Sequence, residues 1–314
     1  MGLGRKGKVG YYKYRKNAKT GGERMRKGKR LIAWIMAVVM LFTICVFGGN
    51  GTAEAAATTP VAKHGRLSVK GADLVDSKGN KFQLRGISTH GINWDVGSPY
   101  VNKKAFKTLR DDWGVNAIRL AMYTEEYNGY CSGGSQAKLR KLVDKGVGYA
   151  TDLGMYAIID WHILSDGNPN KNKSQAKKFF TTMAKKYKNN KNVIYEICNE
   201  PNGCSWKEIK SYATDIIKTI RKYDKKAVII VGTPTWSQLG TDGTSNEVAD
   251  SPIKGYKNIM YSLHFYASEW AHNEYLPAKV AYARKKKLPI IVSEFGLSPA
   301  SGDGALTRHP QTNG

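Results

Sequence analysis

Residues 193–203 read VIYEICNEPNG and pass abruptly from an apolar run into polar residues. The apolar positions between 193 and 198 predict a β-strand that is packed on both faces. Pro201 cannot continue the hydrogen-bond ladder of a strand, so the strand has to end there. We therefore expect Asn199 and Glu200 at the carboxyl end of a buried strand. A glutamate in that place is either a candidate acid or base, or an ordinary solvated residue at the start of a loop.

Strand-like and helix-like segments alternate on both sides of this stretch. The predicted strands are FQLRGIS (82–88), NAIRLAM (116–122), YAIIDWH (156–162), VIYEICN (193–199), AVIIVGT (227–233), NIMYSLHFY (258–266) and LPIIVSEF (288–295). Amphipathic helices with apolar residues at i, i+3, i+4 and i+7 separate them, most clearly around 209–220 and around 139–150 with a stop at Gly154. Repeated βα units predict parallel strands joined by right-handed crossovers, as in a doubly wound sheet or a TIM (β/α)8 barrel.

The positions of the polar residues favour the barrel. Several polar side chains fall at or just beyond the carboxyl ends of different strands, and barrel enzymes draw their catalytic residues from that rim. They are His90, Arg119, His162, Asn199, Glu200, His264, Tyr266 and Glu294. The segment 66–86 alternates around a Lys-Gly-Asn turn and predicts a β-hairpin that closes the bottom of the barrel.

The eighth strand of such a barrel is missing from the pattern. The strands recur about every 35 residues, so an eighth would fall beyond the end of the chain at Gly314. The last stretch, ALTRHPQTNG, has neither helical nor strand periodicity. We therefore expect residues 58–314 to be a C-terminally truncated catalytic barrel, from a protein or a gene that continues further.

The first 57 residues predict a secretory signal. Residues 1–30 hold 12 Lys and Arg residues and a single acid, Glu23, and an apolar run of 17 residues follows at 31–47. Small residues in an Ala-x-Ala pattern then place cleavage near 55–57. We expect an extracellular protein that meets the membrane only transiently; the alternative is an uncleaved signal-anchor.

The charge distribution and the cysteine spacing argue against a nucleic-acid-binding or a metal-binding protein. Much of the net charge of +25 lies in the short block of residues 1–30, and no zinc-finger, RNP or phosphate-loop motif accompanies the other basic runs, so we expect no nucleic-acid partner. Cys131, Cys198 and Cys204 would remain after cleavage, an odd number whose spacing fits no metal site. We expect a monomer without cofactor or metal.

Two strands end in glutamate, the fourth at Glu200 and the seventh at Glu294. In a barrel these strands lie across the mouth from each other. Carboxyl groups about 5–5.5 Å apart there would form the nucleophile and acid/base of a retaining glycosidase. The alternative is that each glutamate only forms an ion pair.

Other residues at the rim suit supporting roles. Arg119 could hold Glu294 ionised, Tyr266 could donate to it, and Asn199 offers an amide to a sugar hydroxyl. The three histidines could bind sugar, be core residues, or form a three-His zinc site, for which no HExxH or paired-Cys pattern exists. Four aromatic residues after strands could stack on sugar rings or pack in the core: Trp94, Tyr123, Trp161 and Trp236.

Seven stretches in order give a specific resemblance. They are LRGISTHG, LRDDWGVNAIRLAMYT, IIDWHILSDGNPN, VIYEICNEPNG, GTPTWSQ, YSLHFYA and IVSEFGLSPASGDG. Over residues 63–306 the chain resembles the family 5 glycoside hydrolases, and most closely their secreted bacterial endo-β-1,4-glucanases. The resemblance implies a (β/α)8 barrel, retention of configuration and no metal.

The resemblance also implies roles for individual residues. Glu200 would be the acid/base and Glu294 the nucleophile. The surrounding shell would be His90, Arg119, His162, Asn199, His264 and Tyr266, with Trp94, Tyr123 and Trp236 along the cleft. The chain departs from the family in lacking the eighth strand, whose tryptophan stacks on the sugar beside the cleavage point. A non-catalytic glucan-binding remnant therefore stays open beside the glucanase, and so does a β-mannanase, because the same shell of residues would serve both substrates.

Overall fold

The computed structural model describes residues 59–240 and 246–300, apart from the side chains of 270–272. The segment Thr59–Gly314 forms one compact unit. The predicted signal region, residues 1–57, lies outside the described residues, so its expected cleavage is untested. None of the described helices combines the length and apolar character that a membrane span requires.

All seven predicted strands are present, and they form one parallel sheet whose spatial order is the chain order. They are β3 (Gly86–Ser88), β4 (Ala117–Tyr123), β5 (Tyr156–His162), β6 (Val193–Glu196), β7 (Ile229–Val231), β8 (Ile259–Tyr266) and β9 (Ile290–Gly296). A doubly wound sheet reverses its strand order at one point, whereas a barrel winds in one direction. The order therefore confirms the barrel and excludes the doubly wound alternative.

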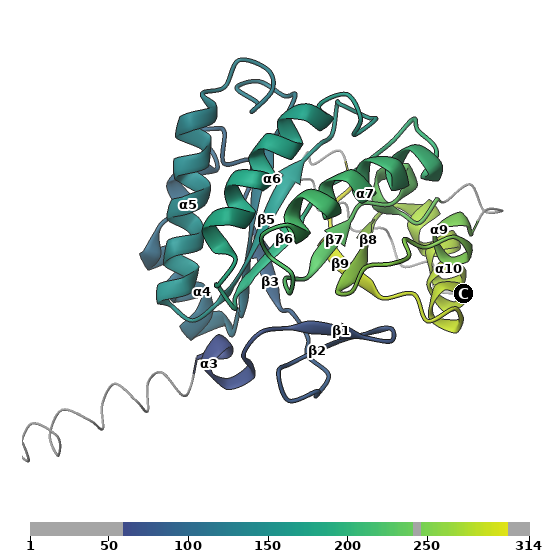
Figure 1. Cartoon of the computed structure of the whole chain (residues 1–314), viewed down its shortest axis with the longest axis horizontal. Helices are drawn as coiled ribbons and strands as arrows, with labels where there is room; N and C mark the ends of the chain where they lie inside the picture. The colour runs from purple at the N-terminus through teal and green to yellow at the C-terminus, as the bar shows by residue number, and fades with distance from the viewer. Residues whose placement is uncertain (1–58, 241–245, 301–314) are drawn as a thin grey trace, which may run out of the picture. The chain divides into compact units, whose positions relative to one another are not determined.

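The helices that connect the strands of this sheet, such as α5 (Gln136–Asp152), α6 (Lys173–Tyr187) and α7 (Trp206–Arg221), lie along its outside (Figure 1). The other described helices are α3 (Pro60–His64), the 3-10 helix η1 (Ser98–Tyr100), α4 (Lys103–Trp113), α8 (Pro234–Ser237), α9 (Glu247–Asp250) and α10 (Trp270–Lys285). The predicted apolar stripe of α7 is buried throughout, and Gly154 follows α5 in a left-handed conformation (φ 63°). Both helix predictions are confirmed.

Alternate residues of each strand face two different cores. In β5, Ala157, Ile159 and Trp161 pack against the helices, while Tyr156 and Ile158 belong to an inner core enclosed by the strands. The same alternation puts Ile194 of β6 and Met260 of β8 inside the barrel. On the same face of these strands, the residues two and four positions closer to the carboxyl end point into the upper part of the barrel, above the inner core.

The predicted hairpin below the barrel exists, but its turn is elsewhere. β1 (Ser68–Lys70) pairs with β2 (Asp73–Val75) across a turn at Gly71, where φ is 62°. The predicted Lys-Gly-Asn turn instead forms a second turn after β2, closed by a bridge between Val75 and Lys81. The Asp76 side chain caps this second turn by accepting from the backbone N–H groups of Lys78 and Asn80. The sequence pattern therefore predicted the hairpin correctly, but the location that it predicted for the hairpin turn was wrong.

β3 and β9 are the edges of the sheet. Within residues 59–240 and 246–300 each pairs with one neighbour, and no strand lies between them, as the sequence predicted. Arg119 Nη1 lies 3.3 Å from Ser88 Oγ of β3 and 2.9 Å from Glu294 Oε2 of β9, so the two edges approach each other at their carboxyl ends. The side chains at these edges are exposed, to 40% for Ile87 and 42% for Val292. The barrel is therefore nearly closed at its rim but open along one seam.

Candidate active site

Arg119 lies at the centre of the rim. Its position on β4 follows Ala117 of the inner core by two residues, so its side chain points into the barrel, where it is 3% exposed. The guanidinium uses all three nitrogens. Nε donates to Glu196 Oε2 (2.6 Å), Nη1 to Glu294 Oε2 (2.9 Å), and Nη2 to Asn199 Oδ1 (2.6 Å) with Asp160 Oδ2 at 3.0 Å. One rigid cation thus orients groups from three different strands.

Glu294 is held in its ionised form. Its Oε2 accepts from Arg119, and its Oε1 accepts from the Tyr266 hydroxyl at 2.5 Å. Burial raises the pKa of Glu294, but the positive charges of Arg119 and the neighbouring imidazoles outweigh burial and hold the pKa well below its ordinary value of 4.5. Burial and the charge of Glu294 raise the pKa of Tyr266, so the phenol keeps its proton and remains a donor.

A β-bulge brings Glu294 to this position. Leu263 of β8 pairs with Val292 of β9, but the next residue, His264, pairs with Glu294, so Ser293 is the extra residue. A bulge lets two consecutive side chains turn to the same side of a strand. Ser293 and Glu294 consequently both reach into the barrel, the first toward Glu196 and the second toward Arg119.

Glu200 lies four residues beyond Glu196, past the end of β6. Its backbone N–H donates to the Ile163 carbonyl at 3.3 Å, and the adjacent Pro201 is buried, so the chain leaves the sheet here as the sequence predicted. The Glu200 side chain is 13% exposed, and its Oε1 lies 2.8 Å from His264 Nδ1. Ligand atoms of Glu200, His264 and Glu294 all lie within 4.8 Å of one another.

This group does not have the donor chemistry of a metal site. His264 Nδ1 is engaged with Glu200, and its Nε2 lies 2.9 Å from Ser293 Oγ. Burial lowers the pKa of His264, but its contacts with Glu196 and Glu200 outweigh burial and raise the pKa from 6.5 to about 9. A protonated imidazole has no lone pair for a cation, so the arrangement favours a proton over a metal.

Asn199 and His162 form the opposite wall. The Asn199 amide donates to His162 Nε2 (3.1 Å) and to the Ile163 carbonyl (3.0 Å), while its oxygen accepts from Arg119. His162 Nδ1 lies 2.6 Å from Asp160 Oδ2, which fixes the ring and its tautomer. The amide is completely buried, so its orientation is set before any ligand arrives.

Aromatic rings line the approach to this wall. The ring centroids of Trp94 and Tyr123 are 4.5 Å apart, those of Tyr123 and His162 are 4.0 Å apart, and exposed His90 lies 5.4 Å from Trp94. A Cβ atom on Gly91 would come within 2.7 Å of the Trp94 ring, so only glycine fits there. The row offers flat apolar faces of the kind that sugar rings stack on.

Trp236 stands apart, with 43% of its surface exposed. It sits in α8, where Thr235, Trp236 and Ser237 all have positive φ, at 60°, 51° and 59°. Such backbone is costly for non-glycine residues and persists only where neighbours hold it. Here Ser237 Oγ donates to the Asn199 carbonyl and the Trp236 N–H donates to the Pro201 carbonyl. The strained turn is thereby tied to the segment that carries Glu200.

Trp161 is not part of this surface, so of the two alternatives that the sequence left open for it, core packing is the one that holds. The side chain is fully buried among Tyr130, Phe179 and Phe180. It falls on the outer face of β5, next to Asp160 and His162 on the inner face. The alternation of the strand turns its side chain toward the helices.

Sequence reasoning also missed three polar residues that contact the site: Asp160, Glu196 and the half-buried Ser293. Asp160 and Glu196 are each a carboxylate within an otherwise apolar strand, and both are completely buried. A charge in the middle of a buried strand costs free energy unless it has a partner. A carboxylate in an apolar strand could therefore have been identified from the sequence as a residue with a buried partner. Ser293 carried no such signal, because its role depends on the bulge.

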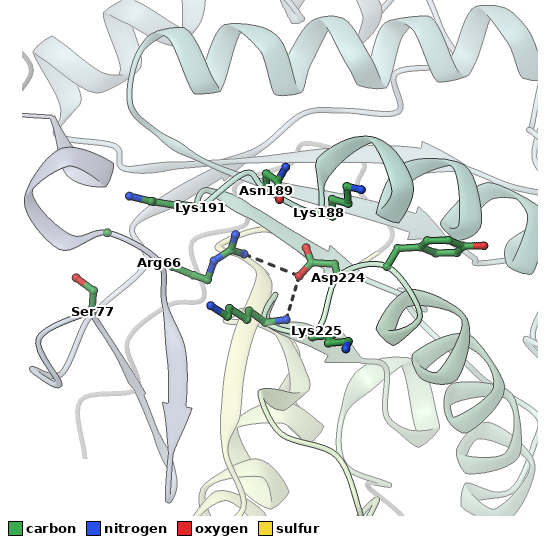
Figure 2. Close-up of a pocket in the computed structure, with 10 residues that line it drawn as sticks. Arg66, Ser77, Lys188, Asn189, Lys191, Asp224 and Lys225 are labelled. Atoms are coloured by element: carbon green, nitrogen blue, oxygen red, sulfur yellow. Dashed lines mark hydrogen bonds and ion pairs between the residues drawn. The ribbon is translucent and has the colours of Figure 1, made fainter.

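A separate pocket of about 560 Å³ lies at the other end of the strands (Figure 2). Part of its lining comes from segments that precede β6 and β7, which places it at the amino ends of these strands, and the rest comes from Gly65, Arg66 and Ser77 beside the hairpin of β1 and β2. The lining is largely basic, with Arg66, Lys188, Lys191, Lys225 and Lys226 around Asp224. It shares no residue with the carboxylate site.

Comparisons with known proteins agree with this geometry. The model of the family described as cellulase (glycosyl hydrolase family 5) matches residues 75–312. An endoglucanase of Clostridium saccharobutylicum is 50% identical over 281 residues, 88% of this chain and 58% of that protein. Endoglucanase A of Butyrivibrio fibrisolvens is 48% identical over 246 residues, 77% of this chain and 54% of that protein. The chain thus spans about half the length of the curated relatives that it matches.

Solved structures extend the likeness to the fold. The catalytic domain of Thermobifida fusca endoglucanase Cel5A superposes with a TM-score of 0.71 and 41% identity, over 79% of each chain. A structure of that domain contains cellotetraose. The structure of a cellulase named Cel5C_n matches with a TM-score of 0.74 and 40% identity, over 79% of this chain and 76% of that one. Since the family model covers well over half of this chain, the chain belongs to the glycosyl hydrolase family 5 cellulases.

Proposed function

We propose that this protein is a secreted endo-β-1,4-glucanase that cleaves internal bonds of cellulose or mixed-linkage glucan with retention of configuration. The observation that carries the proposal is the pair of carboxylates. Oxygen atoms of Glu200 and Glu294 lie within 4.8 Å of each other, which fits the separation of a retaining pair and is too short for the water of an inverting one.

The environments of the two glutamates support the roles that we propose for them. Glu294 carries a charge that Arg119 and Tyr266 stabilise, so it is the nucleophile. In the first step its carboxylate attacks the anomeric carbon while the proton of Glu200 passes to the glycosidic oxygen, and the C–O bond breaks. In the second step the Glu200 carboxylate takes a proton from water as the water oxygen attacks the same carbon. The ester to Glu294 then breaks, and both carboxyl groups return to their initial states.

The substrate class rests on similarity and on the aromatic row. The related Thermobifida fusca domain binds cellotetraose, a chain of four sugars. Trp94, Tyr123 and Trp236 could stack on successive rings of such a chain, and His90 lies beside them. The same shell could serve a mannan, so a β-mannanase is the second candidate within the family.

One experiment tests the activity and the substrate together. The full chain is incubated with carboxymethylcellulose, barley glucan and mannan, and released sugar is measured with the anomeric configuration of the first product. We expect turnover of both glucans, with the β-anomer formed first. Release from mannan alone would replace the glucanase with a mannanase, and an α-anomer would reject the retaining pair. Binding of glucan without any turnover would favour a glucan-binding remnant, motivated by the open seam.

Secretion and the predicted signal segment belong to the same proposal. We expect the extracellular product of a secreting host to begin near residues 55–57, with a monomeric mass in solution. Amino-terminal sequencing of that product checks the cleavage, and a membrane-bound full-length chain would support the signal-anchor instead.

A further inference from the structure

Glu196 lies between the two candidate catalytic glutamates and contacts neither of them. Its side chain is completely buried at the end of β6. Oε2 accepts from Arg119 Nε at 2.6 Å, and Oε1 accepts from Ser293 Oγ at 2.6 Å. Burial raises the pKa of Glu196, but the charges of Arg119 and His264 outweigh it and lower the pKa, so the group is a carboxylate at neutral pH.

The contact with Ser293 determines where the proton of His264 lies. A hydroxyl has one proton to donate, and a carboxylate can only accept, so Ser293 donates to Glu196. Toward His264 Nε2, at 2.9 Å, the same hydroxyl must then be the acceptor. The Nε2 nitrogen consequently carries a proton in every state of the ring.

This fixed proton has a consequence for Glu200. When His264 is an imidazolium, its Nδ1–H donates to Glu200 Oε1, so the proton that Glu200 transfers has to sit on the other oxygen. When the ring is neutral, Nδ1 is a bare acceptor and binds the Glu200 proton itself. Transfer to a leaving group therefore requires the imidazolium.

The second contact of Glu196 leads to the nucleophile. Arg119 Nε is fixed by Glu196, and the opposite side of the same planar guanidinium donates to Glu294. A planar cation held at one edge presents its other donors in a defined direction. Glu196 thus orients the group that keeps Glu294 ionised.

We propose that Glu196 is a positioning residue for both candidate catalytic carboxylates, one through His264 and the other through Arg119. The inference rests on the proposed function for its effect on catalysis, but the protonation of His264 can be measured without any turnover.

Few charges other than Glu196 face the His264 ring. Glu200 follows β6, Glu294 lies on β9, and Arg119 of β4 lies beyond Glu196. β7 is the other neighbour of β8, and its residues Ile229–Val231 are all apolar. Glu196 is the most deeply buried of the three carboxylates, so its removal should change the imidazole more than any rim substitution.

The first test is an NMR titration of the His264 imidazole in the intact chain, assigned by its loss in His264→Asn. We expect the wild-type ring to titrate at about pH 9, and Glu196→Gln to lower that midpoint by more than about one pH unit. Ser293→Ala should shift it in the same direction. The exposed Glu274→Gln, on α10, is the matched control and should change nothing. An unchanged His264 midpoint in folded Glu196→Gln and Ser293→Ala would overturn the proposal.

The second test separates the two contacts by rate. Ser293→Ala breaks only the path to His264, so it should slow poor leaving groups about tenfold or more at neutral pH and spare activated aryl cellobiosides. Glu196→Gln should slow both substrate types, since Arg119 is also released. A uniform loss with the same pH profile in both variants would indicate a purely structural role. If the wild-type chain turns over no β-glucan, the proposed function fails, while the titration still decides the role of Glu196.

Discussion

Glu200 and Glu294 differ in their surroundings, and the difference predicts how their variants behave. Glu294→Ala removes the atom that forms the covalent intermediate, so turnover should fall by on the order of 10⁴-fold or more on every substrate. Glu200→Ala should still form the intermediate from substrates with good leaving groups, because these need little protonation, but it then lacks the base for the second step. Stopped-flow assays with an activated aryl cellobioside should therefore show a burst for Glu200→Ala and none for Glu294→Ala.

The exposed Glu274→Gln is the control for both variants, since it removes a carboxylate that is not among the candidate site residues. A Glu294→Ala protein with a rate near that of wild type would refute the assignment. An identical kinetic profile for the two variants would mean that the two carboxyl groups do not have separate roles.

His264 also predicts a change of stability with pH. Its pKa is raised from 6.5 to about 9 in the folded state, so the folded protein binds the proton more tightly than the unfolded chain. The resulting stability is fully present below about pH 6.5 and is lost as the pH rises through about 9. We expect the free energy of unfolding to fall by about 3 kcal/mol between about pH 6 and about pH 9. Urea denaturation of the wild type across this range measures it.

The control is a pair of histidine variants. His264→Asn should flatten the pH dependence, whereas His90→Asn should leave it intact, because His90 is exposed and outside the ion-pair network. If the wild type is equally stable at both pH values, His264 is neutral in the folded protein.

At the scale of single elements, helix α7 has the most complete start signal in the described chain. Ser205 Oγ accepts from the backbone N–H of Glu208, and the Glu208 carboxylate accepts from the backbone N–H of Ser205, which is a capping box. Ser205→Ala should cost about 1 kcal/mol of unfolding free energy and lower Tm by about 2–4 °C. Thermal denaturation of Ser205→Ala beside Ser205→Thr, which keeps the hydroxyl, checks this. An equal loss in both variants would show that packing at this position, and not the cap, is responsible.

Elements were predictable from sequence where periodicity alone decides them. The stripe of α7 and the apolar runs of β5 and β8 led to the correct segments, because burial repeats every 3.6 or every two residues. β7 spans only Ile229–Val231 and is shorter than predicted. The residues just before it are as apolar as a strand would be, so composition alone does not show where the strand hydrogen bonds end.

The rest of the site depended on geometry that a linear pattern does not carry. The position of Glu294 beside Arg119 requires the bulge at Ser293, and a bulge leaves no periodic trace. For Trp161 the sequence left stacking and core packing open, and the strand alternation decides between them, since a residue between two site residues on a strand points away from them. The buried Glu196 was readable in principle, because an unpaired charge could not remain inside a strand.

At the scale of the whole molecule, the open seam sets the stability. Ile87 of β3 pairs in register with Ile118, which lies in the core under the helices, yet Ile87 is 40% exposed because no helix of residues 59–240 or 246–300 buries it. Val292 and Phe295 on β9 are exposed to 42% and 64%. At roughly 25 cal/mol per Å2, a few hundred Å2 of such uncovered apolar surface forfeits several kcal/mol, comparable to the whole stability of a domain. The unpaired N–H and C=O groups of both edges also offer a template for association.

We therefore expect residues 58–314, produced alone, to be poorly soluble and only weakly active, with measurable turnover in the dilute soluble fraction and light scattering that grows with protein concentration. Ile87→Lys places a charge on the β3 edge and should raise the soluble concentration severalfold, because edge charges oppose strand pairing between copies. Trp113→Lys is the matched control, since Trp113 is 72% exposed on α4, away from both edges. Equal improvement by both variants would point to general surface hydrophobicity instead of the edge. A monodisperse and fully active wild-type segment would show that seven strands suffice and that the cost of the open seam is small.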